Sequence, residues 1–364
     1  MEMVRMMLVL SLLGFLSEAT AKELAFHYKT AEGLTLAGKL ATPDGASYDA
    51  VPRVVILIHG SGPNDMDSSM RAMDGKTRLR YFKTLSDALV EKGFAVVRYN
   101  KRTYELKQLG LKDRSVFKSP LMRRLTKTGW LKGFVDDVEG VARWATGKLP
   151  KAKLYLLGVS QGTHIALIVA HRLKQVAGVA LIGFYSTSLH VQMFEQIVYR
   201  PQSWFVRADT NGDGKLSRAE LLLAGKAGIA IALHLSVFDV DGDGMVSYPE
   251  IQAANIINLY RLGTDLRYQR QELSYPPIPS LVKHSRAPVL FFQGMWDNQT
   301  PAYQAMSMRF LAKNVWKKGN LRFHFFPKLG HLLDPRDRYD SVEYRPMDRA
   351  AQTKLLDEIN RTFK

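Results

Sequence analysis

A serine lies at the centre of the sequence GVSQG, residues 158–162. The preceding residues, KLYLL, form an apolar run typical of a buried strand, and the following residues, THIALIVAHRL, have the pattern of a helix. A GxSxG sequence between a strand and a helix is typical of a sharp turn that exposes a serine hydroxyl above a sheet. The flanking glycines avoid side-chain clashes in so tight a turn. We therefore predict that Ser160 is a nucleophile rather than an ordinary turn serine.

A neutral serine needs a histidine as base, and the histidine needs a carboxylate that orients it. In enzymes built on this turn both partners follow the serine along the chain, with the acid first. His331, in FPKLGHLL, follows the last apolar run, whereas His324 lies inside that run, LRFHFFP, where a buried structural role fits better. We expect His331 to be the base.

The position of the carboxylate follows from the same logic. Asp297 ends the apolar run APVLFFQGMWD and is therefore expected at the end of a strand. The alternatives outside the two acidic loops do not end a predicted buried strand. They are Glu195, Asp265 and Glu272. Asp334 lies close to His331 in sequence, where it would more readily stabilise a turn. We predict Asp297 as the acid, and its alternative role is that of a strand-end turn aspartate.

Acyl transfer also needs donors for a developing oxyanion, usually two backbone amides. One is expected from Gln161, directly after the serine. The other is expected from the glycine-containing turn HGSGP, residues 59–63, which ends an earlier apolar run. Ser61 is the predicted second donor, the alternative being that these glycines only mark a loop.

Two further segments, DTNGDGKLSRAE (209–220) and DVDGDGMVSYPE (239–250), have the residue types of calcium loops. Positions one, three, five, nine and twelve carry side-chain oxygens, position seven offers its carbonyl, and position six is glycine. The predicted ligands are Asp209, Asn211, Asp213, Lys215, Ser217 and Glu220 in the first loop and Asp239, Asp241, Asp243, Met245, Ser247 and Glu250 in the second. Leu216 and Val246 occupy the same apolar position in both loops, which favours a paired arrangement over two solvated turns. We predict two structural Ca²⁺ sites.

The elements that must position these residues are predicted from short apolar runs that alternate with helical patterns. After an opening β-hairpin, the runs VVILIHG, FAVVRYN, KLYLLGVS, VAGVALIGFY, APVLFFQGMWD and LRFHFFPKLG suit strands covered on both faces. The predicted fold class is α/β, with a mostly parallel, doubly wound sheet. The alternation stops between Tyr185 and Ala287, where both acidic loops lie. We therefore divide the chain into core residues 22–187, a helical insertion at 188–281 and core residues 282–364.

The ordered set RVVILIHGSGP, FAVVRYNKR, FVDDVEGVARW, LLGVSQG, GMWDNQTP and LGHLL resembles the α/β-hydrolase superfamily, especially bacterial esterases and dienelactone-hydrolase-like members. The resemblance covers about residues 24–187 and 282–363. The inserted loops resemble an EF-hand pair, and their location implies a lid folded around calcium. The chain departs from this resemblance at Asn100 and Thr103, where relatives usually have Asp and Gly, and at Thr163, which replaces a small residue.

Composition restricts the chemistry and suggests a compartment. The 364 residues contain no cysteine, which excludes disulfides and a thiolate nucleophile. Residues 1–21 resemble a secretory signal cut after Ala21, and the alternative is an uncleaved anchor. No second apolar run of that kind follows, so we expect no transmembrane segment in the mature chain. Export to the periplasm or the exterior is the prediction.

The formal net charge is +17, and residues 101–132 alone hold ten Lys or Arg against Glu105 and Asp113. This stretch is either a solvated connection or a contact for anionic lipid headgroups, polysaccharide or nucleic acid. Nucleic acid is not the partner that we expect.

These residues together predict an exported serine hydrolase that acts on a small-molecule ester, with a carboxylesterase favoured. Calcium would be structural, and the chemical step would need no metal. A peptidase or amidase of the same fold is one alternative, because the same groups cleave amides. The other is a non-catalytic calcium-dependent binding protein, against which the complete order of serine, acid and histidine argues.

Overall fold

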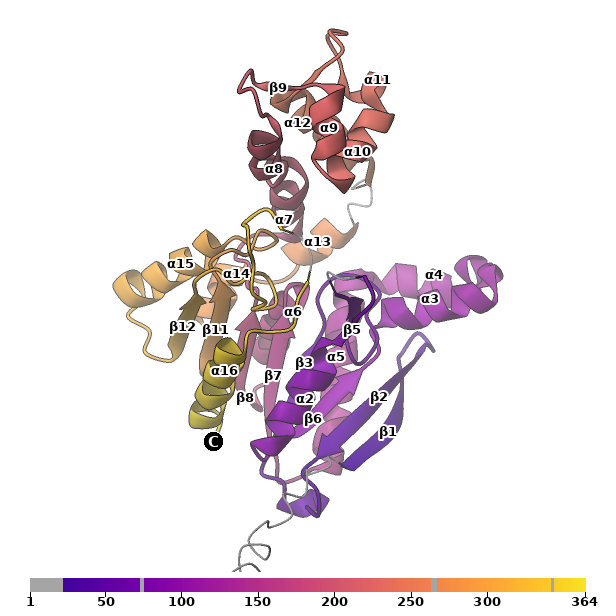
Figure 1. The fold of residues 1–364 in the computed structure, drawn as a ribbon. Helices are drawn as coiled ribbons and strands as arrows, with labels where there is room; N and C mark the ends of the chain where they lie inside the picture. Colours follow the sequence, from indigo (N-terminus) through magenta and orange to yellow (C-terminus); the bar gives the residue numbers. More distant parts are fainter. Residues whose placement is uncertain (1–21, 73–74, 263–266, 342–343) are drawn as a thin grey trace, which may run out of the picture.

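The computed structural model describes residues 22–72, 75–262, 267–341 and 344–364. Its centre is an eight-stranded sheet in the order β1-β2-β6-β3-β7-β8-β11-β12 (Figure 1). The first two strands pair antiparallel as the predicted hairpin, and β2 pairs antiparallel with β6, while every later pair is parallel. The strands are β1 (Lys22–Lys29), β2 (Thr35–Thr42), β3 (Arg53–Ile58), β6 (Ala95–Tyr99), β7 (Lys153–Val159), β8 (Val176–Ile182), β11 (Val289–Gly294) and β12 (Leu321–Phe326).

Helices cover both faces of the sheet, which explains why the central strands are nearly continuous apolar runs. One face packs against α5 (Trp130–Lys148), α6 (Gln161–Arg172), α14 (Ile278–Lys283) and α15 (Ala302–Phe310). The opposite face packs against α2 (Tyr81–Glu91) and α16 (Arg349–Thr362). The predicted α/β fold with a mostly parallel, doubly wound sheet is confirmed.

Short elements connect these layers. They are η1 (Tyr48–Ala50), the small hairpin of β4 (Ser69–Arg71) and β5 (Arg78–Arg80), and η4 (Leu311–Val315).

Between β8 and β11 the chain leaves the sheet and forms mainly short helices. These are α7 (Leu189–Phe194), η3 (Glu195–Tyr199), α8 (Pro201–Ala208), α9 (Arg218–Leu223), α10 (Lys226–Leu233), α11 (Leu235–Phe238), α12 (Tyr248–Leu262) and α13 (Arg267–Leu273), with the short strands β9 (Lys215–Leu216) and β10 (Val246–Ser247). Elements α8 to α12, here called the EF-hand module, have an apolar core of their own that includes Phe205, Leu216 and Val246. In Figure 1 this module lies beyond the upper end of the main sheet.

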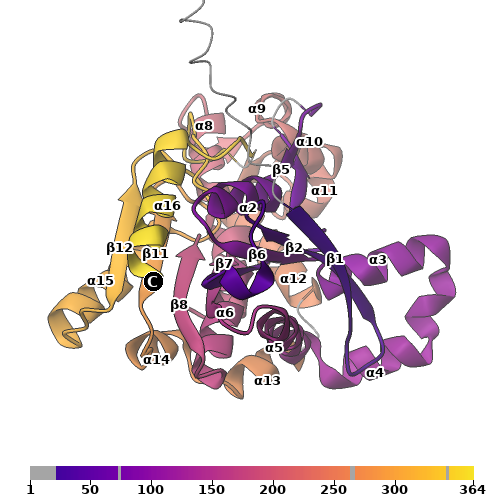
Figure 2. The ribbon, with the colours of Figure 1, turned by 90° about the horizontal axis from the view of Figure 1, so that it is seen from below.

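A second helical segment follows β6. It consists of α3 (Arg102–Lys112), η2 (Arg114–Lys118) and α4 (Pro120–Thr128), and we call residues 102–128 the basic arm. Figures 1 and 2 both show α3 and α4 side by side at the margin of the molecule. The sequence analysis offered a solvated connection as one interpretation of this basic stretch, and in the structure the stretch is mainly helical. Within the described ranges, no helix combines the length and the hydrophobicity that a membrane span requires.

Candidate active site and calcium loops

Ser160 lies in the turn between β7 and α6, in a backbone conformation that is rare for residues other than glycine. Its φ is 54° and its ψ is −123°. A Cβ added to Gly158 would lie 2.3 Å from the Gly162 carbonyl oxygen, and one added to Gly162 would lie 2.2 Å from that of Ile58. Glycine is therefore required on both sides of the serine, as the motif predicted.

Thr163 helps to hold this turn, although it departs from the small residue that relatives usually have. Its hydroxyl donates a 2.7 Å hydrogen bond to the Ser160 carbonyl oxygen. The Ser160 amide donates to the Ile182 carbonyl oxygen at the end of β8. The serine is thus fixed to the neighbouring strand as well as to its own helix.

Asp297 and His331 form a buried hydrogen-bonded pair at the ends of β11 and β12. The Nδ1 atom of His331 lies 2.8 Å from Oδ2 of Asp297, and the two residues are 4 % and 0 % exposed. Burial by itself would raise the pKa of the Asp297 carboxyl. The charge of His331, with hydrogen bonds from His331 and Thr300, outweighs burial and holds that pKa below its usual value.

Further donors fix the Asp297 carboxylate. The Gln299 and Thr300 amides donate to Oδ1 at 2.8 and 2.9 Å. The Thr300 hydroxyl and the Gln293 side-chain amide donate to Oδ2 at 2.6 and 3.0 Å. A carboxylate held by so many donors is rigid and stays ionised, which suits a group that orients an imidazole.

The structure brings Ser160, Asp297 and His331 to the same edge of the sheet. They follow β7, β11 and β12, whose carboxyl ends lie together with that of β8. His331 packs on Gly183, directly after β8, where an added Cβ would lie 2.8 Å from its Cε1 atom. Within the described part of the chain, the Ser160 hydroxyl makes no hydrogen bond to the His331 ring. The roles of these three residues are therefore taken up as a proposal below.

The alternatives to these residues occupy other surroundings. His324 stacks on Phe292 and faces Glu358, away from the serine turn. Asp334 is buried beside Arg336 and accepts a hydrogen bond from the Leu332 amide, so it stabilises the turn that carries His331.

The turn HGSGP packs directly against the serine. A Cβ on Gly60 would lie 3.0 Å from the Cβ of Ser160 and 3.6 Å from its hydroxyl oxygen. The carbonyls of Gly60 and Ser61 accept hydrogen bonds from the Asn64 side chain, at 3.2 and 2.9 Å. The backbone around Ser61 is therefore close to the nucleophile and held in place.

Lys101 connects this turn to the residue after the serine, and the sequence analysis did not single it out. Its Nζ donates to the Gly60 carbonyl oxygen at 2.6 Å and to Oε1 of Gln161 at 2.8 Å, and it lies 4.2 Å from the ring centre of Phe134. The residue is 3 % exposed, and burial lowers the pKa of its amine to about 7, against the opposing charge of Asp137. Both segments that carry the predicted oxyanion donors therefore share one buried amine.

The other departures also have structural partners. The Asn100 side chain accepts from the Met66 amide and donates to Glu105, and the Thr103 hydroxyl donates to the Gly62 carbonyl oxygen. Hydrogen bonds thus stabilise the loop whose geometry the sequence left open.

Beneath this loop the buried side chain of Arg102 forms two 2.7 Å hydrogen bonds to Asp137. Burial raises the pKa of the Asp137 carboxyl to about 6, although Arg102 acts in the opposite direction. The pair fixes α3 to α5 immediately next to Lys101.

Both acidic loops have the backbone geometry of calcium loops. Gly214 and Gly244 have φ values of 80° and 83° at the sixth position, where only glycine fits easily. β9 and β10 pair through Leu216 and Val246, as the matched apolar positions predicted. Each loop ends in a capping box, in which Ser217 and Glu220 exchange hydrogen bonds, as do Ser247 and Glu250.

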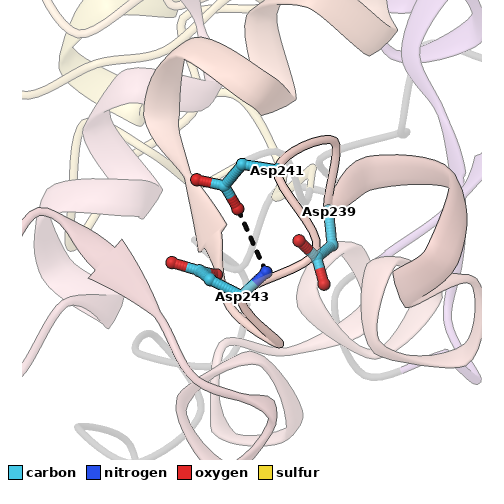
Figure 3. A group of neighbouring side chains, drawn as sticks. All are labelled: Asp239, Asp241 and Asp243. Atoms are coloured by element: carbon cyan, nitrogen blue, oxygen red, sulfur yellow. Dashed lines mark hydrogen bonds between the residues drawn. The ribbon is translucent and has the colours of Figure 1, made fainter.

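Carboxylates converge in the second loop. Oxygens of Asp239, Asp241 and Asp243 lie within 4.8 Å of one another (Figure 3). The Asp243 amide donates to Asp241, which closes the loop around them. The side chain of Lys215 reaches across from the first loop, hydrogen-bonds to Asp243 and lies 3.6 Å from Asp241. A set of oxygen donors with glycine at the sixth position fits Ca²⁺. In this structure the ammonium group of Lys215 contacts two of the same carboxylates.

Comparison with known proteins finds sequence similarity to EF hands and to an esterase. The family model for the EF hand matches residues 202–223 and 234–254. Esterase EstD of Thermotoga maritima is 31 % identical over 164 residues, which is 45 % of this chain and 34 % of that esterase. The match thus spans about a third of the length of the esterase.

Solved structures are similar in fold over 94 % of the chain. An esterase from Pyrococcus furiosus aligns with a TM-score of 0.50 at 12 % identity, over 94 % of this chain and 92 % of the other. An acylaminoacyl peptidase from Pyrococcus horikoshii aligns with a TM-score of 0.51 at 15 % identity, over 94 % of this chain and 42 % of the other. Similarity at this level of identity concerns the fold. The chain therefore has the α/β-hydrolase fold, and between β8 and β11 it carries two segments that match the EF-hand model.

Proposed function

We propose that this protein is a serine hydrolase, and that its substrates are carboxylic esters. The observation that supports this most strongly is the buried Asp297–His331 pair, at the same edge of the sheet as a serine held in a strained turn. An orienting carboxylate gives the imidazole a fixed tautomer, whose free nitrogen can accept the proton of a nucleophile.

In the proposed reaction Ser160 attacks the ester carbonyl while His331 accepts the hydroxyl proton. The oxyanion receives hydrogen bonds from the amides of Ser61 and Gln161. His331 then protonates the leaving alcohol and later activates a water that hydrolyses the acyl-enzyme. Asp297 keeps its negative charge throughout and stabilises the imidazolium. Each of these steps uses groups of the chain itself.

A fluorophosphonate probe tests the nucleophile directly. The wild-type protein should be labelled at Ser160 and should hydrolyse p-nitrophenyl acetate, whereas Ser160→Ala should lose both properties and keep its circular dichroism spectrum. Ser307→Ala is the matched control, because Ser307 lies on the exposed side of α15 and bonds only to the Tyr303 carbonyl oxygen. Turnover that persists in Ser160→Ala would refute the assignment. Faster cleavage of a matched p-nitroanilide than of the ester would indicate an amidase.

We further propose that the two acidic loops bind Ca²⁺ for a structural purpose. Calcium, when bound, supplies the positive charge that holds the converging carboxylates together. The six predicted ligands of each loop would hold one ion. Lys215 and Met245 would bind through their backbone carbonyl oxygens and the other residues through their side chains. Because the EF-hand module has its own apolar core, the ion would stabilise this module rather than take part in ester cleavage.

Calorimetric titration of chelated protein tests the calcium proposal. Two binding events are expected, together with a rise in melting temperature. Glu250→Gln should remove most of one event, because it weakens the ligand at position twelve. An absence of calcium heat with an unchanged melting temperature would show that the loops do not bind the ion.

Export is also a proposal, since residues 1–21 lie outside the described ranges. Expression with the native N-terminus, followed by N-terminal sequencing, should yield protein that begins at Lys22. Retention of the full N-terminus in the cell would contradict it.

A further inference from the structure

The basic arm carries cations that have no acidic partners. Six cationic side chains of the arm are exposed: Lys107, Lys112, Arg114, Lys118, Arg123 and Lys127. Among the described residues none of these six forms an ion pair. The two acidic residues of the arm bond to other groups, Glu105 to the Ala37 amide and Asn100, and Asp113 to Ser115. The arm is therefore a locally unbalanced positive surface.

Large apolar side chains lie among these cations. Leu111 is 72 % exposed and Phe117 is 52 % exposed, at the junction of α3 and η2. The Phe117 ring lies so close to Gly110 that an added Cβ there would be 2.4 Å from it. Single exposed apolar residues are ordinary on protein surfaces, but two on the same short arm as six exposed cations suit the boundary between lipid headgroups and acyl chains.

A hollow of about 760 Å³ lies behind these two side chains. Leu106, Leu111, Phe117, Met122 and Trp130 give it apolar walls, and Lys107 and Arg114 add positive charge. Its other wall is formed by Gly62 and Pro63, the end of the turn that packs on Ser160. An apolar hollow with positive charge at its walls is complementary to an acyl chain that carries an anionic headgroup.

We propose that the basic arm docks the protein on bilayers containing anionic lipids, with Leu111 and Phe117 entering the acyl boundary and the hollow receiving one acyl chain. Docking needs only the arm and does not depend on hydrolysis. It does, however, give the proposed esterase a source of substrate, because the hollow ends at the turn next to Ser160. Esters dissolved in such a bilayer would then be presented to the site.

Vesicle co-sedimentation tests the charge component. The protein should bind phosphatidylcholine vesicles that contain phosphatidylglycerol and should not bind pure phosphatidylcholine, and high salt should release it. The triple variant Lys112→Glu, Arg114→Glu, Lys118→Glu should lower the partition coefficient by about a hundredfold or more, because each cation near an anionic leaflet contributes about fivefold. The triple variant Lys148→Glu, Lys151→Glu, Lys174→Glu is the matched control, with the same charge change on exposed lysines outside the arm.

Tryptophan fluorescence tests the apolar component, since Trp130 lines the hollow. Anionic vesicles with brominated acyl chains should quench the emission of the wild type. Trp130→Phe should lose that quenching while still sedimenting with the vesicles. The double variant Leu111→Ser, Phe117→Ser should weaken sedimentation although its charge is unchanged.

Several outcomes would overturn the proposal. They are equal binding to neutral and anionic vesicles, equal losses in the arm and control triple variants, and binding to duplex DNA in the absence of binding to anionic vesicles. Hydrolysis of water-soluble p-nitrophenyl acetate by the arm variants should remain at the wild-type level. If even the wild type lacked that activity, the proposed esterase function would fail while the docking result would stand.

Discussion

Replacement of Lys101 by Met should change how the stability of the protein depends on pH. Lys101 is buried against Phe134, and its amine bonds to the Gly60 carbonyl oxygen and to the Gln161 side chain. Burial lowers its pKa from 10.5 to about 7. Met has a similar length and no charge, so the variant removes the titrating group without opening a large cavity.

The sign of the effect follows from proton binding. Between the folded pKa of about 7 and the unfolded value of 10.5, the unfolded chain holds a proton on Lys101 that the folded protein has largely released. Stability therefore rises with pH in this window, by at most about 1.4 kcal/mol per pH unit. From about pH 7.5 to about pH 9 the gain due to Lys101 is about 2 kcal/mol. Below about pH 7 Lys101 is charged in both the folded and the unfolded protein, so the full cost of burying its charge lowers the free energy of unfolding.

Urea unfolding of wild type and Lys101→Met at several pH values measures this contribution, because titrations that do not depend on Lys101 cancel in the difference. The free energy of unfolding of the wild type, minus that of the variant, should increase across the window. Lys132→Met is the control, since Lys132 is exposed and pairs with Asp136 at the surface. Parallel pH curves for wild type and Lys101→Met would refute the reasoning and show that Lys101 stays charged when buried.

Three other predictions concern the site and the calcium loops. Asp297→Asn should lower kcat by about 10⁴-fold with the fold intact, because an amide no longer holds the imidazole in the required tautomer, and steady-state kinetics would show this. Arg102→Met should destabilise the protein by about 3–5 kcal/mol in urea unfolding, since it leaves the buried carboxylate of Asp137 without its partner. Lys215→Met should tighten calcium binding in calorimetry, because its ammonium contacts Asp243, a predicted ligand.

The sequence predicted the sheet well because its central strands are covered on both faces and must be apolar throughout. Ser160, Asp297 and His331 each come within a few residues after such a strand, so their location at one edge of the sheet could be expected from the sequence. A functional residue that follows a buried parallel strand can be recognised in the sequence, because an apolar run comes shortly before a polar residue. The calcium loops can also be recognised in the sequence, because all predicted ligands of one loop lie at fixed positions within one short segment.

Lys101 was missed because burial of a charged side chain depends on segments far away in the sequence. Lys101 is one of ten basic residues between 101 and 132, and nothing local in the sequence separates it from the exposed Lys107. The basic arm was missed as a helical element for the same reason. Its charge suggested a solvated connection, while the contacts that fix it come from β2, α5 and the insertion.

Helix α13 explains how the inserted segment can influence the site at a distance from the calcium loops. Its Tyr268 accepts a hydrogen bond from the side chain of Gln161, the residue that follows Ser160. Its Gln271 bonds to the backbone at the base of the basic arm, on both sides of Gly129. Its Glu272 accepts from the amide of Leu189, where the insertion begins. One short helix thus contacts the predicted oxyanion residue, the arm and the first turn of the insertion. A change in the insertion that shifts α13 would therefore move these contacts together.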